Sequence, residues 1–100
     1  MTHQEFKNRI HALAVELGAN IEIETRGETI TRAVVNVGRW ASLFVTFNSY
    51  FNKIETCDTD GEEETIDEKS IEKVIAFHYL NALATHLENV AEYISDELAK

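Results

Sequence analysis

The amino-acid sequence predicts an α+β fold: an N-terminal helix, a four-stranded antiparallel meander and a long C-terminal helix. Three observations lead to this prediction. Apolar residues recur every three or four positions up to residue 17, alternate with polar residues from residue 20 to residue 56, and return to helical spacing beyond residue 65. A chain of 100 residues has the size of one domain. We therefore expect residues 1–100 to form a single α+β domain.

The first helix is predicted by its two ends. Thr2 and Glu5 form a capping box, in which each side chain can accept a hydrogen bond from a backbone N–H group at the helix start. Gly18 supplies the left-handed residue that commonly ends a helix. Four apolar residues between these ends share one face: Phe6, Ile10, Leu13 and Leu17.

The four strands are predicted where the apolar period changes to two, which places alternate side chains on opposite faces of a sheet. Gly27 and the pair Asn48 and Ser49 provide short turns between them. Short turns join antiparallel neighbours, so we expect a meander. The four segments are residues 21–26, 28–37, 40–47 and 50–56.

Two faces of this sheet are predicted to differ. Leu43, Val45 and Phe47 share the face expected to meet the helices, whereas Trp40 and Phe44 share the other. If that second face is open, the two aromatic side chains form a candidate binding face or half of a dimer core. The alternative is a sheet covered on both faces by the two helices.

A second capping box, Thr65 with Glu68, predicts the start of the C-terminal helix. No glycine or proline follows Gly61, so residues 66–99 could run as one helix of about 50 Å, whereas a 100-residue domain has a radius of gyration near 13 Å. The apolar residues step by three and four along the seam of a coiled coil: Phe77, Leu80, Ala84, Leu87, Ala91, Ile94 and Leu98.

Two arrangements would cover this seam. The helix could break near Asn81 into a hairpin, or two copies could pack their long helices antiparallel. We favour the homodimer, with Leu80, Leu87 and Ile94 buried between the subunits.

Charge is unevenly distributed along the chain. Residues 1–54 hold five acids and six bases and are nearly neutral, whereas residues 55–100 hold thirteen acids and three bases, so the second half carries all of the negative net charge of the chain, which is −9 in total. Such a field repels nucleic acid and anionic lipid and steers cationic partners. We expect a cationic protein or nucleoprotein partner and no direct binding of nucleic acid.

No apolar run approaches the length of a membrane span, and the first ten residues lack the apolar stretch of a secretory signal. We therefore expect no membrane association and a cytoplasmic location.

The segment CDTDGEEETIDE, residues 57–68, concentrates this charge, and residues 57–65 are predicted to be an acidic loop that connects sheet and helix. A calcium loop would need other residues at Thr56, Glu63 and Asp67, so a metal is not expected. The seven carboxylates are the primary candidates for partner binding: Asp58, Asp60, Glu62, Glu63, Glu64, Asp67 and Glu68.

Catalytic chemistry is not indicated. Each pair of histidines, His3 with His11 and His78 with His86, is eight residues apart, where a helical zinc site would use three or four. The single cysteine, Cys57, sits among carboxylates that disfavour a thiolate, and no nucleotide-binding or nucleophile motif occurs. We expect no enzyme activity, no metal and no cofactor.

The acidic segment and the charge asymmetry give the chain a class-level resemblance to small phage-encoded anti-CRISPR and anti-restriction proteins. That resemblance implies an inhibitor, acting in the cytoplasm of a host cell, that presents carboxylates in place of nucleic-acid phosphates. The chain is also similar to type III secretion chaperones, which are small acidic homodimers with apolar grooves. A third interpretation is that the acidic loop is only a solvated connection.

Overall fold

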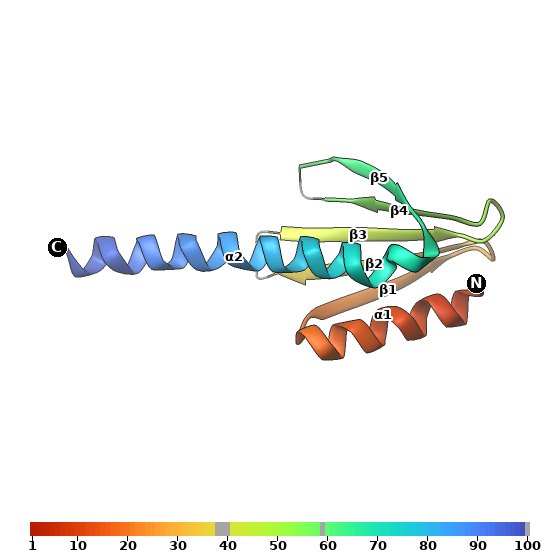
Figure 1. The fold of residues 1–100 in the computed structure, drawn as a ribbon, viewed down its shortest axis with the longest axis horizontal. Coiled ribbons are helices and arrows are strands. Elements are labelled where there is room, and N and C mark those ends of the chain that lie inside the picture. The colour runs from red at the N-terminus through yellow and green to blue at the C-terminus, as the bar shows by residue number, and fades with distance from the viewer. Residues whose placement is uncertain (38–40, 59, 100) are drawn as a thin grey trace.

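The computed structural model describes residues 1–37, 41–58 and 60–99. Within these ranges the chain forms two α-helices, one short 3-10 helix and a five-stranded sheet (Figure 1). The α+β class is confirmed. The elements, in chain order, are α1 (His3–Leu17), β1 (Asn20–Arg26), β2 (Ile30–Val37), β3 (Ala41–Asn48), β4 (Lys53–Cys57), β5 (Glu63–Ile66), η1 (Glu68–Ser70) and α2 (Ile71–Leu98).

The first helix forms as its end signals predict. The backbone N–H of Glu5 donates a hydrogen bond to Oγ1 of Thr2 at 3.1 Å. Gly18 ends the helix in the left-handed conformation, with φ of 66°, which costs glycine little because it has no Cβ. Phe6, Ile10 and Leu13 are buried on the predicted face.

The sheet is an antiparallel meander in which each strand pairs with the next, in the order β1-β2-β3-β4-β5. The prediction of four strands is wrong: β5 is an additional edge strand within the segment 57–65 that was predicted to be a loop. It pairs with β4 from Ile54 opposite Ile66 to Cys57 opposite Glu63. A polar sequence is tolerated there because an edge strand keeps much of its surface in solvent.

The predicted capping box of Thr65 and Glu68 is also wrong, again because β5 forms in this segment. Thr65 lies inside β5, η1 follows Asp67, and α2 begins only at Ile71. Backbone pairing with Glu55 of β4 therefore takes Thr65 into the sheet in place of a helix start.

The core lies between the sheet and the two helices, which both pack on the same face of the sheet (Figure 1). The predicted inner face of β3 is confirmed, since Leu43, Val45 and Phe47 are all buried. Phe6 of α1 stacks on Phe47, with 5.5 Å between the ring centroids. The alternative in which the helices cover both faces is wrong, because the described helices leave the opposite face uncovered.

The terminal helix α2 is continuous from residue 71 to residue 98, so the predicted alternative of a break near Asn81 is wrong. We call residues 71–83 its packed half and residues 84–98 its projecting half. The packed half lies beside α1 against β2 and β3, and the projecting half extends beyond the sheet (Figure 1). The molecule is consequently elongated, with extents of 57 × 25 × 23 Å.

Candidate binding surfaces

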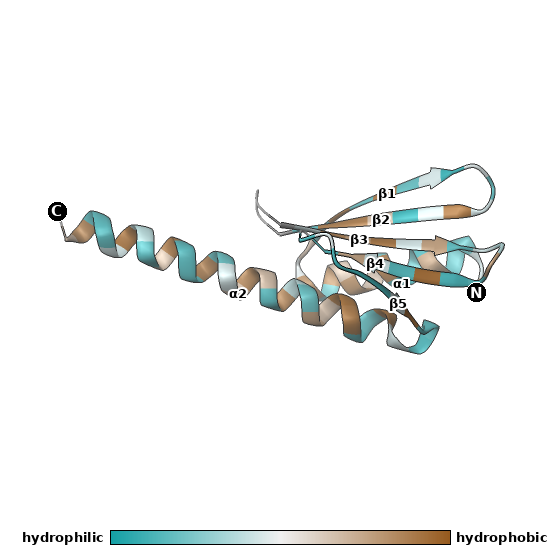
Figure 2. Cartoon of the chain, turned by 90° about the horizontal axis from the view of Figure 1, so that it is seen from above, coloured by the Kyte–Doolittle hydropathy of each residue, from teal (hydrophilic) through white to brown (hydrophobic). Residues whose placement is uncertain are grey.

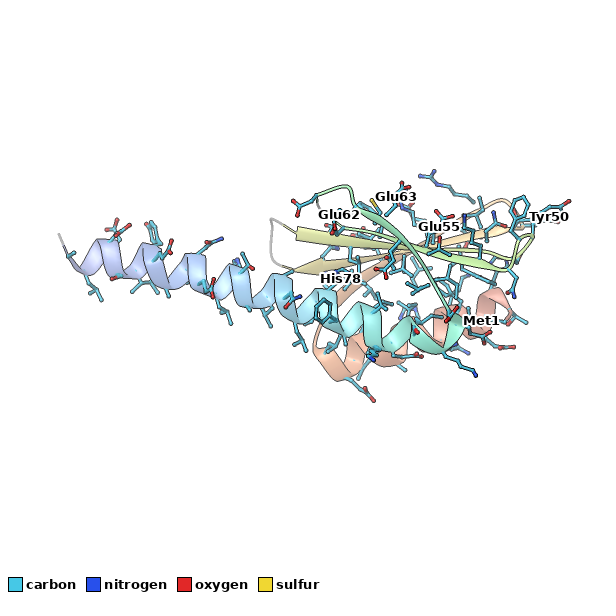
Figure 3. The ribbon with its side chains drawn as sticks, turned by 45° about the horizontal axis from the view of Figure 1, so that its top comes forward. Met1, Tyr50, Glu55, Glu62, Glu63 and His78 are labelled. Atoms are coloured by element: carbon cyan, nitrogen blue, oxygen red, sulfur yellow. The ribbon has the colours of Figure 1, made fainter. Side chains whose placement is uncertain are left out.

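Four exposed carboxylates surround the start of β5, and we call Asp60, Glu62, Glu63 and Glu64 the acidic edge. Glu63 and Glu64 belong to the edge strand, whereas Asp60 and Glu62 lie in the loop that precedes it. Figure 3 shows Glu62 and Glu63 on the outer margin of the sheet. The β-strand alternation directs Glu63 and Glu64 to opposite faces, so this charge wraps around the margin.

The acidic edge is built on a local turn held by Asp58. Oδ1 of Asp58 accepts hydrogen bonds from the backbone N–H groups of Asp60 and Glu62, each at 3.0 Å. Gly61 adopts a φ of 84°, which glycine tolerates better than other residues. Asp58 was predicted to bind a partner, but its carboxylate is used inside the turn. The Asp-x-Asp-Gly composition is a turn signal that indicates this role.

The other two predicted carboxylates lie beyond the far end of β5. Glu68 is 3.5 Å from Nη1 of Arg9, and Asp67 precedes η1, where its carbonyl accepts a hydrogen bond from the backbone N–H of Ser70. The strand places about 13 Å of backbone between these residues and the loop. The seven predicted carboxylates therefore form two groups, of which only the acidic edge is a continuous exposed cluster.

Within the described residues, no ion pair involves the acidic edge. The nearby Glu55 of β4 does have a partner, because its Oε1 lies 2.9 Å from Nζ of Lys53. Figure 3 shows Glu55 on the same side of the sheet as Glu63. The uncompensated charge of this region thus comes from the acidic edge itself.

The open face of the sheet carries one of the two predicted aromatic residues. Phe44 lies there half-buried, and the guanidinium of Arg32 stacks over its ring at 4.3 Å from the centroid. Trp40 lies outside the described residues, so the predicted aromatic pair is not tested. Around Phe44 the face combines both signs of charge, including Arg26, Glu55 and Glu63. Its charge is therefore mixed, unlike that of the acidic edge.

The histidines do not gather into a site within the described chain. His3 has a structural role: its Nδ1 hydrogen-bonds Oγ1 of buried Thr31 at 2.5 Å, and its Nε2 hydrogen-bonds Oγ of Ser49 at 2.9 Å. No group of three or more His, Cys, Asp or Glu side chains among the described residues is arranged to hold a metal. A cavity of about 200 Å³ beside His78 is smaller than the 300–1,000 Å³ typical of ligand pockets.

An ion pair joins the middle of α1 to the start of α2. Nε and Nη2 of Arg9 donate to the two carboxylate oxygens of Glu72 at 2.6 and 2.7 Å. These two hydrogen bonds lower the pKa of the Glu72 carboxyl group. The same bonds raise the pKa of the Arg9 guanidinium. The pair orients the packed half of α2 against α1 and belongs to the fold.

A second candidate surface is the predicted seam of α2. Its large residues are exposed, including Phe77, Leu80, Leu87, Ile94 and Leu98. Figure 2 shows hydrophobic and hydrophilic residues alternating along the projecting half. Phe77 and Leu80 belong to the packed half but point away from the sheet, since they are 62% and 54% exposed. The seam therefore runs along most of the helix on the side away from the core.

Comparison of the chain with models of protein families, with curated proteins and with solved structures found no match. The resemblance to phage-encoded inhibitors therefore stays a prediction. Among the described residues, neither helix combines the length and the apolar composition needed to cross a membrane.

Proposed function

We propose that this protein is a non-enzymatic inhibitor that occupies the nucleic-acid channel of a cationic, nucleic-acid-handling complex. The supporting observation is the acidic edge, where four carboxylates are exposed on the margin of the sheet and take part in no ion pair of the described chain. The chain binds as a protein partner and does not itself bind nucleic acid, because its net charge of −9 repels phosphates.

The spacing of the acidic edge suits a phosphate surrogate. An extended chain rises about 3.3 Å per residue and directs successive side chains to opposite faces, so Glu63 and Glu64 of β5, with Glu62 just before the strand, supply about one carboxylate per 3.3 Å on alternating sides of the margin. One strand of B-DNA carries one phosphate per 3.4 Å along its axis. A channel with Lys and Arg side chains on both walls would therefore meet a similar density of negative charge along its axis, divided between the two walls.

The chemistry of such an interface favours arginine and lysine. Carboxylates accept charge-assisted hydrogen bonds from guanidinium and ammonium groups, and arginine can do so with two parallel bonds. The negative field also accelerates the encounter with a cationic surface. Because these charges are exposed, their attraction is screened over about 8–10 Å at physiological ionic strength, and binding weakens as salt is raised.

A second function, that of a small acidic homodimeric chaperone or adaptor, is favoured by the exposed seam of α2. An unfolded client would bind through apolar contacts, and its retention would depend little on salt. The exposed apolar residues of the projecting half supply the surface for such contacts, including Leu87 and Ile94.

A pull-down from host cytoplasm at low and high salt, with bound proteins identified by mass spectrometry, separates these functions. We expect wild-type protein to retain a nucleic-acid-binding complex at low salt, and the variant E62Q/E63Q/E64Q to lose it. The matched control is E16Q/E22Q/E28Q, which removes the same charge from exposed glutamates away from the acidic edge.

Equal retention by both triple variants and by wild type would contradict the role of the acidic edge. Equal loss from both variants would show that net charge, and no particular surface, governs binding. Salt-resistant capture of an unfolded client would favour the chaperone.

A further inference from the structure

The projecting half of α2 leaves the chain with more surface than its mass requires. A compact monomer of 11.4 kDa exposes about 5,800 Å² by the scaling of surface with mass, whereas this chain exposes 6876 Å². The excess of about 1,100 Å² is comparable to the roughly 800 Å² that each partner buries in a stable interface. The radius of gyration is 15.5 Å, against about 13 Å for a compact chain of this length.

We propose that a second copy of the chain covers the seam, with the two α2 helices antiparallel and Ala84 of each copy opposite Leu87 of the other. The proposal concerns assembly and is independent of the proposed inhibitor, because it uses no residue of the acidic edge, but it covers the seam that the chaperone would offer to a client. Three features of α2 support it: the position of the seam, the sizes of the facing residues and the distribution of charge along the helix.

The seam is accessible to a second helix because it lies opposite the core. Ala84 follows Ile75 by nine residues, which is two and a half turns at 3.6 residues per turn. Ile75 is buried against the sheet, so Ala84 points to the opposite side. A second α2 packed along Ala84 would therefore meet the solvent side of the helix without displacing the sheet.

The sizes of the seam residues favour one antiparallel register. When Ala84 faces Leu87 of the second copy, the next layer places Ala91 opposite Leu80, the third places Phe77 opposite Ile94, and the outermost places Leu98 opposite Lys73. The inner layers thus pair small with large side chains, which lets facing layers interdigitate without voids. A parallel pair in register would instead place Ala84 opposite Ala84 and Ala91 opposite Ala91, which leaves two underfilled layers.

The residues that flank the seam agree with this register. On one side Leu83 faces Val90 of the second copy, and on the other Asn81 faces Glu88. No flanking pair therefore places one acid opposite another. A parallel pair would bring the acidic ends of the two helices together.

The charge along α2 also favours the antiparallel pair. The projecting half holds no Lys or Arg and four acids: Glu88, Glu92, Asp96 and Glu97. The packed half holds Lys73, which the antiparallel register places beside the acidic end of the other copy. The opposed helix dipoles add a further favourable contribution.

Sedimentation tests whether the dimer forms. We expect wild-type protein to be a dimer at high micromolar concentration and L87D to raise the dissociation constant by about 100-fold or more, because two buried leucines become charged residues. The matched control is Y93D. Tyr93 is 66% exposed in the same projecting half, but it follows Ile75 by 18 residues, or five full turns, and so lies away from the seam. Y93D should remain a dimer.

The orientation is tested by the distance between spin labels on S95C in a C57S background. The antiparallel register separates the two labels by about 29 Å along the helix axis, whereas a parallel pair holds them near the interhelical distance of about 10 Å. A distance near 10 Å would overturn the antiparallel register. A monomeric wild type at high micromolar concentration would overturn the dimer and indicate that another protein covers the seam.

Discussion

The packed half and the projecting half of α2 share one apolar spacing but have very different surroundings. Ile75 in the packed half is 1% exposed, and Ile94 in the projecting half is 50% exposed. Ile75 contributes to the core with α1 and the sheet, whereas Ile94 lies outside the core formed by the described residues. Helical periodicity therefore predicts that a helix has an apolar face, but it does not predict which molecule covers that face.

The largest effect is expected in the packed half. I75A should lower the free energy of unfolding by about 2–5 kcal/mol, because it removes buried methyl groups and leaves a cavity between α2 and the sheet. Urea denaturation monitored by circular dichroism measures this change. The loss in free energy should not depend on protein concentration, as long as wild type keeps the same assembly state over the concentrations used. A loss below about 1 kcal/mol would show that α2 packs less tightly than the structure indicates.

The same substitution in the projecting half should behave differently. I94A removes a contact that the dimer alone provides, so we expect it to weaken dimerisation by about 1–3 kcal/mol per chain. Its effect on the unfolding midpoint should be clear at high protein concentration and should vanish where wild type is also monomeric. Denaturation at two protein concentrations checks this. A shift independent of concentration would place Ile94 in an intrachain contact.

A smaller effect on stability is expected from removing the ion pair between Glu72 of the packed half and Arg9 of α1. The pKa of Glu72 is lowered, chiefly by hydrogen bonds from Arg9. Its contribution to stability is therefore present above the ordinary pKa of 4.5 and is lost as the pH falls through the lowered pKa of the folded state. E72Q should cost about 1 kcal/mol or less near neutral pH, because the pair is partly exposed and screened by solvent.

Urea denaturation near neutral pH and in strong acid measures this difference. E72Q and wild type should differ near neutral pH and converge in acid, where Glu72 is protonated. The control E16Q removes an exposed carboxylate that forms no ion pair within the described residues, and it should follow wild type at both pH values. A difference between E72Q and wild type that persists in acid would show that the glutamine itself disturbs the helix.

Local signals predicted the first helix and the inner face of the sheet. Thr2 and Gly18 act within a few residues of the helix ends that they define, and the alternation around Val45 reports burial on one side of a strand. Such features depend on neighbours in the sequence. They can therefore be predicted without any tertiary contact.

The edge strand and the division of the carboxylates could not be predicted in the same way. Thr65 enters β5 because it pairs with Glu55 across the sheet, a contact that no helix-start signal reports. Glu68 is paired through Arg9, which lies 59 residues earlier in the chain. Composition predicted an acidic region correctly, but only tertiary contacts separate the acidic edge from carboxylates used by the fold.

Hydrogen exchange of α2 at high micromolar and nanomolar concentration tests most directly the claim that a second copy covers the projecting half. An isolated helical segment of about 15 residues is marginal in water, so its amides exchange slowly only while the seam is paired. We predict that residues 84–98 are protected at high concentration and exchange rapidly at low concentration, while residues 71–83 keep the same protection. Equal exchange of residues 84–98 at both concentrations, in a chain that sediments as a monomer, would contradict the account.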